Sequence, residues 1–170
     1  VPEGDFIASG EGEESLLGLL SVLEGRSELD ELSGLATRDK SGKGIVLNSS
    51  KRIKNLNQDN IPFPARHLLP MENYIQAQEG HGPSSGRWTS ILSSRGCPYG
   101  CTFCESRRTT WIAREPSDVV DEMEFCLKEW GINEFHFEDD NMTINTDRLI
   151  GICDEIISRG LKIKWQTPNG

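Results

Sequence analysis

The chain has 170 residues, a length that suits one domain or two small ones. Its 18 Lys and Arg residues against 27 Asp and Glu residues give a formal net charge of −9, so we do not expect nucleic-acid binding through bulk charge. No apolar run approaches the roughly 20 residues that a membrane-spanning helix needs. The five cysteines are an odd number with three packed close together, which is not typical of a secreted disulfide framework and indicates reduced thiols in the cytoplasm.

Both ends of the sequence are expected to be cuts inside a longer protein. Residues 1–4 contain no initiator Met and lack the basic and apolar segments of a signal peptide. Residues 167–170 follow a strand-like run directly. We therefore interpret the chain as a fragment.

Residues 1–55 are predicted to form the end of an α/β unit. Residues 5–9 suit a short strand, and a turn rich in Gly and Glu leads into a helix over residues 15–23. Leucines at positions 16, 19, 20 and 23 share one face of that helix. Residues 35–38 and 44–48 are predicted to form a small hairpin.

Residues 56–86 are predicted to be a linker between two domains. Residues 61–70 contain three prolines, which exclude a regular helix or a central strand. Residues 78–86 are rich in Gly and Ser and are predicted to be a loop.

Residues 87–170 are more regular. Strands are predicted at 87–94, 133–137 and 161–165, and helices at 116–130 and 146–158, each with an apolar stripe and a Gly at its end. Strands that alternate with helices of this length predict parallel β/α units, either half of a barrel or part of a doubly wound sheet.

The strongest signal is the run Cys97-Pro98-Tyr99-Gly100-Cys101-Thr102-Phe103-Cys104, a C-x3-C-x2-C spacing. Three thiolates on one loop can hold three irons of a cubane cluster, which leaves the fourth iron open for a substrate. Gly96 and Gly100 are expected to let the loop fold tightly. The loop follows a predicted strand, so it is expected at the carboxyl end of a β/α unit, where such folds place active sites.

Two other interpretations of the cysteines remain open. A structural zinc site needs four ligands, and Cys101 with Cys104 could supply half of one. Cys126 and Cys153 are isolated on predicted helix faces, where we interpret both as core residues, and the histidines at 67, 81 and 136 are isolated as well. A redox C-x2-C pair would leave Cys97 unexplained.

With Phe103 as its aromatic residue, the motif resembles the signature of the radical S-adenosylmethionine superfamily. The resemblance covers residues 87–170 and implies the first half of a partial (β/α)6 barrel. It implies a [4Fe–4S] cluster on Cys97, Cys101 and Cys104, with S-adenosylmethionine bound at the open iron. One electron from the reduced cluster would break the S–C5′ bond to give a 5′-deoxyadenosyl radical, while the protein binds, orients and excludes water.

The resemblance also implies contacts to S-adenosylmethionine. Phe103 would lie beside the adenine, and the alternative is that it packs in the core. Glu138, Asp139 and Asp140 occupy the place of a Gly-Gly-Glu-like stretch that contacts the methionine ammonium, although the glycines are absent here. Carboxylates accept hydrogen bonds from an ammonium, and the alternative is a solvated acidic turn.

The first part of the chain resembles the tail of the cobalamin-binding domain that precedes many radical S-adenosylmethionine domains, and residues 56–66 resemble the connector between the two. The fold class implied is α/β, a radical S-adenosylmethionine half-barrel preceded by the C-terminal end of a Rossmann-like cobalamin-binding domain. The Asp-x-His-x-x-Gly segment that supplies the lower cobalt ligand in typical members is not in this chain.

The predicted function is reductive cleavage of S-adenosylmethionine, with cobalamin as a possible further cofactor, for methyl transfer or another radical transformation. A small molecule or lipid would be the substrate, and a flavodoxin or ferredoxin the reductant. The fragment alone is expected to be inactive. The alternative is a non-catalytic iron–sulfur or zinc module for electron transfer or binding.

Overall fold

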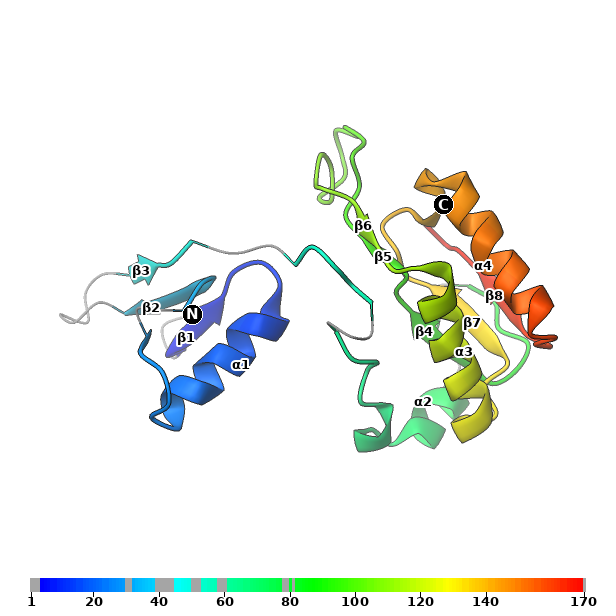
Figure 1. Ribbon diagram of the computed structural model, residues 1–170, viewed down its shortest axis with the longest axis horizontal. Coiled ribbons are helices and arrows are strands. Elements are labelled where there is room, and N and C mark those ends of the chain that lie inside the picture. Colours follow the sequence, from blue (N-terminus) through cyan, green and yellow to red (C-terminus); the bar gives the residue numbers. More distant parts are fainter. Residues whose placement is uncertain are drawn as a thin grey trace. The chain divides into compact units, whose positions relative to one another are not determined.

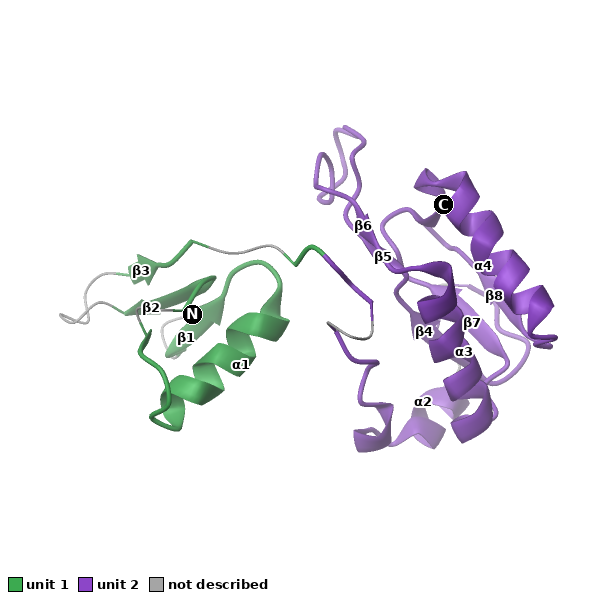
Figure 2. Ribbon diagram, viewed as in Figure 1, with its two compact units in different colours: residues 1–54 green, residues 55–170 purple. Residues whose placement is uncertain are grey.

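The computed structural model describes residues 4–29, 32–38, 45–49, 53–57, 61–77, 80 and 82–169. The chain divides into two compact units, residues 1–54 and residues 55–170 (Figures 1 and 2). Both combine helices with strands, and the sheets include antiparallel and parallel ones, so the α/β class is confirmed. No helix within the described ranges is long and apolar enough to cross a membrane.

The first unit is a three-stranded antiparallel sheet with one helix (Figure 1). The strand order is β1 (Phe6–Ala8), β2 (Leu35–Arg38) and β3 (Ile45–Leu47), and helix α1 (Gly12–Leu23) connects the first two. The predicted strand, helix and hairpin are confirmed. The helix begins earlier than predicted, and its first turn includes Glu13 and Glu14, whose charges suit the positive end of the helix dipole. Because β1 and β2 run antiparallel, α1 is not a parallel crossover.

The second unit is built on a parallel sheet in the order β4 (Trp88–Ile91), β7 (Glu134–Phe137) and β8 (Lys164–Gln166). Helices α3 (Pro116–Trp130) and α4 (Thr146–Ser158) cover one face of it (Figure 1). Both helices have the predicted bounds, and the parallel β/α units are confirmed. Gly131 ends α3 with a φ of 63°, and the Asn145 side chain accepts a hydrogen bond from Arg148 N at the start of α4.

The two faces of the parallel sheet differ in polarity. Phe135 and Phe137 on β7 belong to the apolar core that α3 and α4 share with the sheet. The alternate residues, Glu134 and His136, are buried as well but make polar contacts. His136 Nε2 lies 3.1 Å from Glu134 Oε1 and 2.7 Å from Gln166 Nε2.

Ser85, which precedes β4, and Trp88, its first residue, contact the polar face that Glu134 and His136 form. The N–H and hydroxyl of Ser85 both donate to Glu134 Oε2, and Trp88 stacks on the His136 ring at 4.4 Å. Burial acts to raise the pKa of Glu134, but the hydrogen bonds from His136 and Ser85 outweigh it and leave that pKa below its usual value. Positions 78, 79 and 81 of the predicted loop lie outside the described residues.

The segment predicted as a linker packs into the second unit. It forms a short 3₁₀ turn, η2 (Arg66–Leu68), and helix α2 (Met71–Ala77), which the sequence analysis did not predict. The Arg66 side chain is buried, with Nη1 2.6 Å from Glu122 Oε1 and Nη2 donating to Ser90 O at 3.0 Å. Arg114 pairs with the other oxygen of Glu122 and with Asp118. The buried carboxylate of Glu122 therefore joins two arginines, one that precedes β4 in the chain and one that follows it.

We expect Glu122→Gln to lower the free energy of unfolding by about 3–5 kcal/mol, because it leaves two buried guanidinium groups without full compensation. Urea denaturation followed by tryptophan fluorescence would measure the loss. Glu124→Gln on the same helix is the control, because Glu124 pairs with Lys128 and Arg159 nearer the surface. Equal losses in the two variants would contradict the assignment.

Candidate metal centre

The three clustered cysteines lie on a loop that projects from the carboxyl end of β4 (Figure 1). Two short strands, β5 (Ser94–Arg95) and β6 (Ile112–Ala113), pair antiparallel and carry the loop between them. The position at the end of the first parallel strand is the one predicted from the sequence.

Main-chain hydrogen bonds close the neck of the loop. Thr109 N donates to Cys97 O at 2.9 Å, and Cys97 N donates to Thr109 Oγ1 at 2.8 Å. One step further out, Arg108 N donates to Tyr99 O at 2.8 Å. The residues that carry the thiols are therefore held in a defined turn by the protein chain itself.

The two glycines of the loop differ in what their positions require. Gly96 has a φ of +84°, and a Cβ there would lie 2.3 Å from Thr110 O, so only glycine fits. Gly100 does not have a positive φ, and a Cβ would meet only the end of the Arg108 side chain at 3.3 Å. The expectation that the loop needs glycine therefore holds for Gly96.

The thiols of the loop are accessible. Cys101 is exposed, while Cys97 and Cys104 are half-buried, and all three are free. Within the described part of the chain, no three His, Cys, Asp or Glu side chains gather around a point where a single metal ion could bind. In a cubane cluster each thiolate binds its own iron, and the loop supplies three thiols for such a donor set.

The other two cysteines differ from these. Cys126 is fully buried in the core, as predicted, and burial raises the pKa of its thiol to about 11. Cys153 on α4 is only half-buried and is not part of the core cluster, so the core prediction is wrong for it.

The acidic segment after β7 reaches the base of the loop. Asp139 is 1 % exposed and accepts hydrogen bonds from Ser93 N at 2.7 Å, Ser93 Oγ at 2.6 Å and Ser94 Oγ. Asp140 accepts hydrogen bonds from Gly96 N at 2.9 Å and from Ser106 Oγ. The alternative of a solvated turn is therefore wrong for Asp139. Glu138 N donates to Ile91 O, which keeps the segment beside β4.

Phe103 lies on the surface of the loop. It is 92 % exposed, so the alternative that it packs in the core is wrong. Tyr99 in the same loop is also exposed. Two aromatic side chains therefore stand beside the thiols and are available for contact with another molecule.

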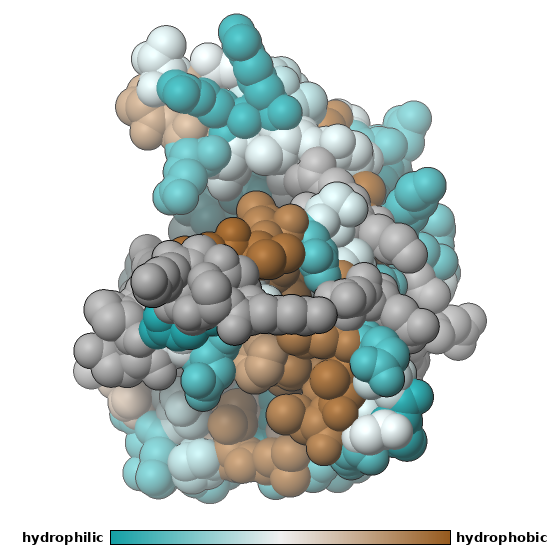
Figure 3. All heavy atoms as spheres, turned by 90° about the vertical axis from the view of Figure 1, so that its left-hand side faces the viewer, coloured by the Kyte–Doolittle hydropathy of each residue, from teal (hydrophilic) through white to brown (hydrophobic). Residues whose placement is uncertain are grey.

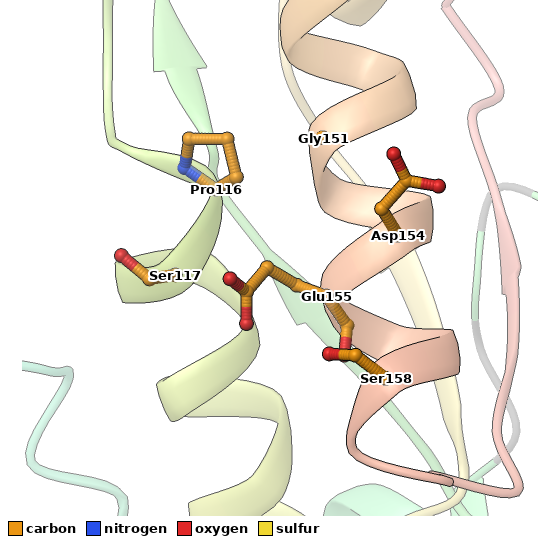
Figure 4. A pocket seen from close by; sticks show the side chains of 6 residues that line it. All are labelled: Pro116, Ser117, Gly151, Asp154, Glu155 and Ser158. Atoms are coloured by element: carbon orange, nitrogen blue, oxygen red, sulfur yellow. The ribbon is translucent and has the colours of Figure 1, made fainter.

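A shallow groove lies elsewhere, between α3 and α4 (Figure 4). It holds none of the predicted site residues and is lined by Pro116, Ser117, Gly151, Asp154, Glu155 and Ser158. Glu155 also pairs with Arg159 at 3.0 Å, as part of the surface charge network of the two helices. The cysteine loop therefore remains the candidate site.

No protein-family model matches the chain, but curated proteins do. A protein described as an uncharacterized methyltransferase from Pyrococcus horikoshii is 34 % identical over 164 residues, which cover 95 % of this chain and 34 % of the relative. The cytidylyl-2-hydroxyethylphosphonate methyltransferase of Streptomyces wedmorensis is 34 % identical in an alignment that covers 99 % of this chain and 36 % of the relative. The anaerobic magnesium-protoporphyrin IX monomethyl ester cyclase of Cereibacter sphaeroides is 33 % identical over 95 % of this chain and 26 % of the relative.

A solved structure matches the chain over nearly its whole length. The cobalamin-dependent S-adenosylmethionine radical enzyme OxsB, with aqua-cobalamin and S-adenosylmethionine bound, superposes on 94 % of this chain with a TM-score of 0.71 and 25 % identity. The chain belongs to the radical S-adenosylmethionine superfamily. TsrM from Kitasatospora setae, solved with cobalamin and a [4Fe–4S] cluster, has the same fold over 91 % of the chain at a TM-score of 0.60 and 22 % identity. This radical S-adenosylmethionine chain spans about a third of the curated relatives' length and 22 % of OxsB.

We expect Gly96→Ala in this radical S-adenosylmethionine chain to lose iron uptake, because the added methyl group collides with Thr110 O at the neck of the loop. Gly100→Ala is the matched control and should retain uptake. Iron would be measured after anaerobic reconstitution, with circular dichroism to confirm that both variants are folded. Normal iron uptake by Gly96→Ala would contradict the conclusion.

In iron-free protein, iodoacetamide at about pH 8 should alkylate the three loop cysteines and leave Cys126 unmodified. Burial hides its sulfur and holds its pKa well above that pH, so little thiolate forms. Peptide mass spectrometry would locate the modified residues, and labelling in urea would provide the control in which Cys126 reacts. Alkylation of Cys126 in folded protein at the rate of the loop cysteines would show that its burial is wrong.

Proposed function

We propose that this chain is the cluster-bearing part of a cobalamin-dependent radical S-adenosylmethionine enzyme. The observation that carries the proposal is the loop of three free thiols at the carboxyl end of β4, in a chain that matches OxsB over nearly its whole length. Cys97, Cys101 and Cys104 would bind three irons of a [4Fe–4S] cluster, which supplies the electron that cleaves S-adenosylmethionine to a 5′-deoxyadenosyl radical.

The chain's own residues would bind and orient S-adenosylmethionine. We assign the exposed ring of Phe103 to contact with the adenine, since an aromatic face beside the thiols suits stacking on a flat base. We assign Glu138, Asp139 and Asp140 to contact with the methionine ammonium. Carboxylates and strand-end carbonyls accept hydrogen bonds from an ammonium group. The segment follows β7 and contacts the base of the cysteine loop. This supports the assignment, because the ammonium group would have to bind close to the cluster.

We further propose that residues 87–170 form the first half of a (β/α)6 barrel. The polar face of the sheet supports this, because a parallel sheet between two helix layers would be apolar on both sides. Glu134, His136 and Gln166 instead gather on the face opposite the helices, which would be the inner face of such a barrel. Residues 56–86 would connect this half-barrel to the first domain.

Residues 1–55 would be the C-terminal remnant of a Rossmann-like cobalamin-binding domain. The first unit, taken by itself, leaves many apolar side chains exposed, and apolar surface is visible on the face drawn in Figure 3. They come from α1, β1 and β3, namely Phe6, Ile7, Leu16, Leu17, Leu20, Leu23, Ile45, Val46 and Leu47. Such a surface is typical of an interface with another part of a protein.

The relatives are methyltransferases and a cyclase, so we propose methyl transfer or another radical transformation of a small molecule or lipid. A flavodoxin or ferredoxin would supply the electron. We propose the cytoplasm as the compartment, because the cluster needs reduced thiols.

Anaerobic reconstitution of the protein should give about four irons and four sulfides per chain. The spectrum of the reduced cluster should change when S-adenosylmethionine is added, because the open iron binds it. Cys101→Ala should abolish the cluster, whereas Cys153→Ala, on α4, should retain it. Electron paramagnetic resonance and iron analysis measure both outcomes.

Equal loss of iron in the two cysteine variants would count against the ligand assignment. Tightly bound zinc without iron would favour a non-catalytic binding module. A full cluster whose spectrum does not respond to S-adenosylmethionine would favour an electron-transfer module.

A further inference from the structure

Two neighbouring carboxylates after β7 bind the chain on both sides of the cysteine loop's base. Asp139 holds Ser93 and Ser94, the residues through which the chain leaves β4 and enters β5. Asp140 holds Gly96, directly before the first cysteine, and Ser106, two residues after the last. A single carboxylate therefore bridges the two limbs of the loop.

The bridge at Asp140 is hard to replace. Gly96 is buried but Asp140 is exposed, so removal of the carboxylate takes away the charged acceptor of the Gly96 N–H and opens that amide to water. Hydrogen bonds to an ionised carboxylate are stronger than those between neutral groups. Asp140 therefore helps to set the separation of the limbs and ties both of them to the end of β7.

Other contacts fix the base of the loop, and the bonds between Cys97 and Thr109 join its two limbs beside Asp140. Arg148 on α4 donates through Nη2 to Ser93 O and through Nε to Arg114 O, each at 2.7 Å. Arg114 N in turn donates to Ser93 O at 2.9 Å. These bonds hold the stem of the loop, whereas Asp140 acts at the level of the cysteines, together with the bonds between Cys97 and Thr109.

We propose that Asp140, supported by Asp139, is a positioning residue for the metal centre. It fixes the two limbs of the loop before metal binds and acts on the cluster through Cys97 and Cys104. The inference rests on the proposed function only in naming an iron–sulfur cluster as the ligand of the loop. It also couples the proposed ammonium-binding segment to the thiols, because Asp140 belongs to that segment.

The first test uses iron-free protein, so it does not depend on the cluster. Asp140→Ala should speed exchange of the Gly96 amide hydrogen at least about tenfold, because the charge-assisted bond that protects it is lost. Ser106→Ala removes only the other bond and should leave that amide protected. Glu105→Ala, an exposed carboxylate of the same loop, is the control without effect. Unchanged protection of Gly96 in Asp140→Ala would overturn the proposal.

The second test uses reconstituted protein. Asp140→Asn keeps a carbonyl oxygen that can accept one of the two bonds but carries no charge. Positioning predicts that iron content and the cluster's paramagnetic spectrum follow the order wild type, Asn, Ala. If both variants keep full iron and an unchanged spectrum and lose only the response to S-adenosylmethionine, Asp140 acts on the cofactor alone and the proposal is wrong.

These outcomes separate the positioning residue from the proposed function. If wild-type protein takes up no iron, the proposed function fails, while the amide-exchange test still decides how Asp140 acts on the loop. If Asp140→Ala does not fold, Asp140→Asn takes its place in both tests. Equal Gly96 protection in wild type and Asp140→Asn, with equal iron content and spectra, would then overturn the proposal.

Discussion

The buried carboxylate of Asp139 joins the ends of two neighbouring parallel strands. It accepts three hydrogen bonds from Ser93 and Ser94, which follow β4, while its own backbone follows β7. A buried carboxylate is stable only when its oxygens are well supplied with donors, so the two strand ends must stay together. The cysteine loop starts at Gly96, two residues beyond Ser94, and its place at the end of the sheet depends on this junction.

A second buried carboxylate, Glu122, likewise joins segments that are far apart in the sequence. Glu122 joins Arg66, which precedes the sheet, to Arg114, which follows the loop. The stem of the loop is thereby tied to α3 and to the segment before β4. Two acidic side chains thus account for how a loop with few apolar contacts stays attached to a small sheet.

Much of the fold could be predicted from the spacing of apolar residues and from the Pro and Gly residues at the ends of the elements. The apolar stripes of α3 and α4, with Pro116 at the start of one and Gly131 at its end, gave both helices their bounds. Helix α2 was missed because it is only seven residues long and follows a proline-rich run. The pairing of Arg66 with Glu122 could not be predicted, since no sequence spacing relates residues that meet only in the tertiary structure.

The candidate site also has a part that the sequence predicts and a part that it does not. The cysteine spacing alone pointed to the loop, because the ligands are close in sequence. What Asp139 and Asp140 bind could not be seen, since their partners lie more than thirty residues away in the chain. The serines at the end of β4 were the available signal, as polar residues beside a buried strand end need acceptors.

The closed neck of the loop has a consequence for how the protein matures. Zinc fingers stay unfolded until their metal binds, since metal is the main source of their stability. Here, the bonds between Cys97 and Thr109 and those from Gly96 and Ser106 to Asp140 hold the ends of the loop through protein atoms alone. Because neither these bonds nor the apolar core uses a thiol of the loop, removal of the inorganic cofactor is expected to leave the polypeptide folded.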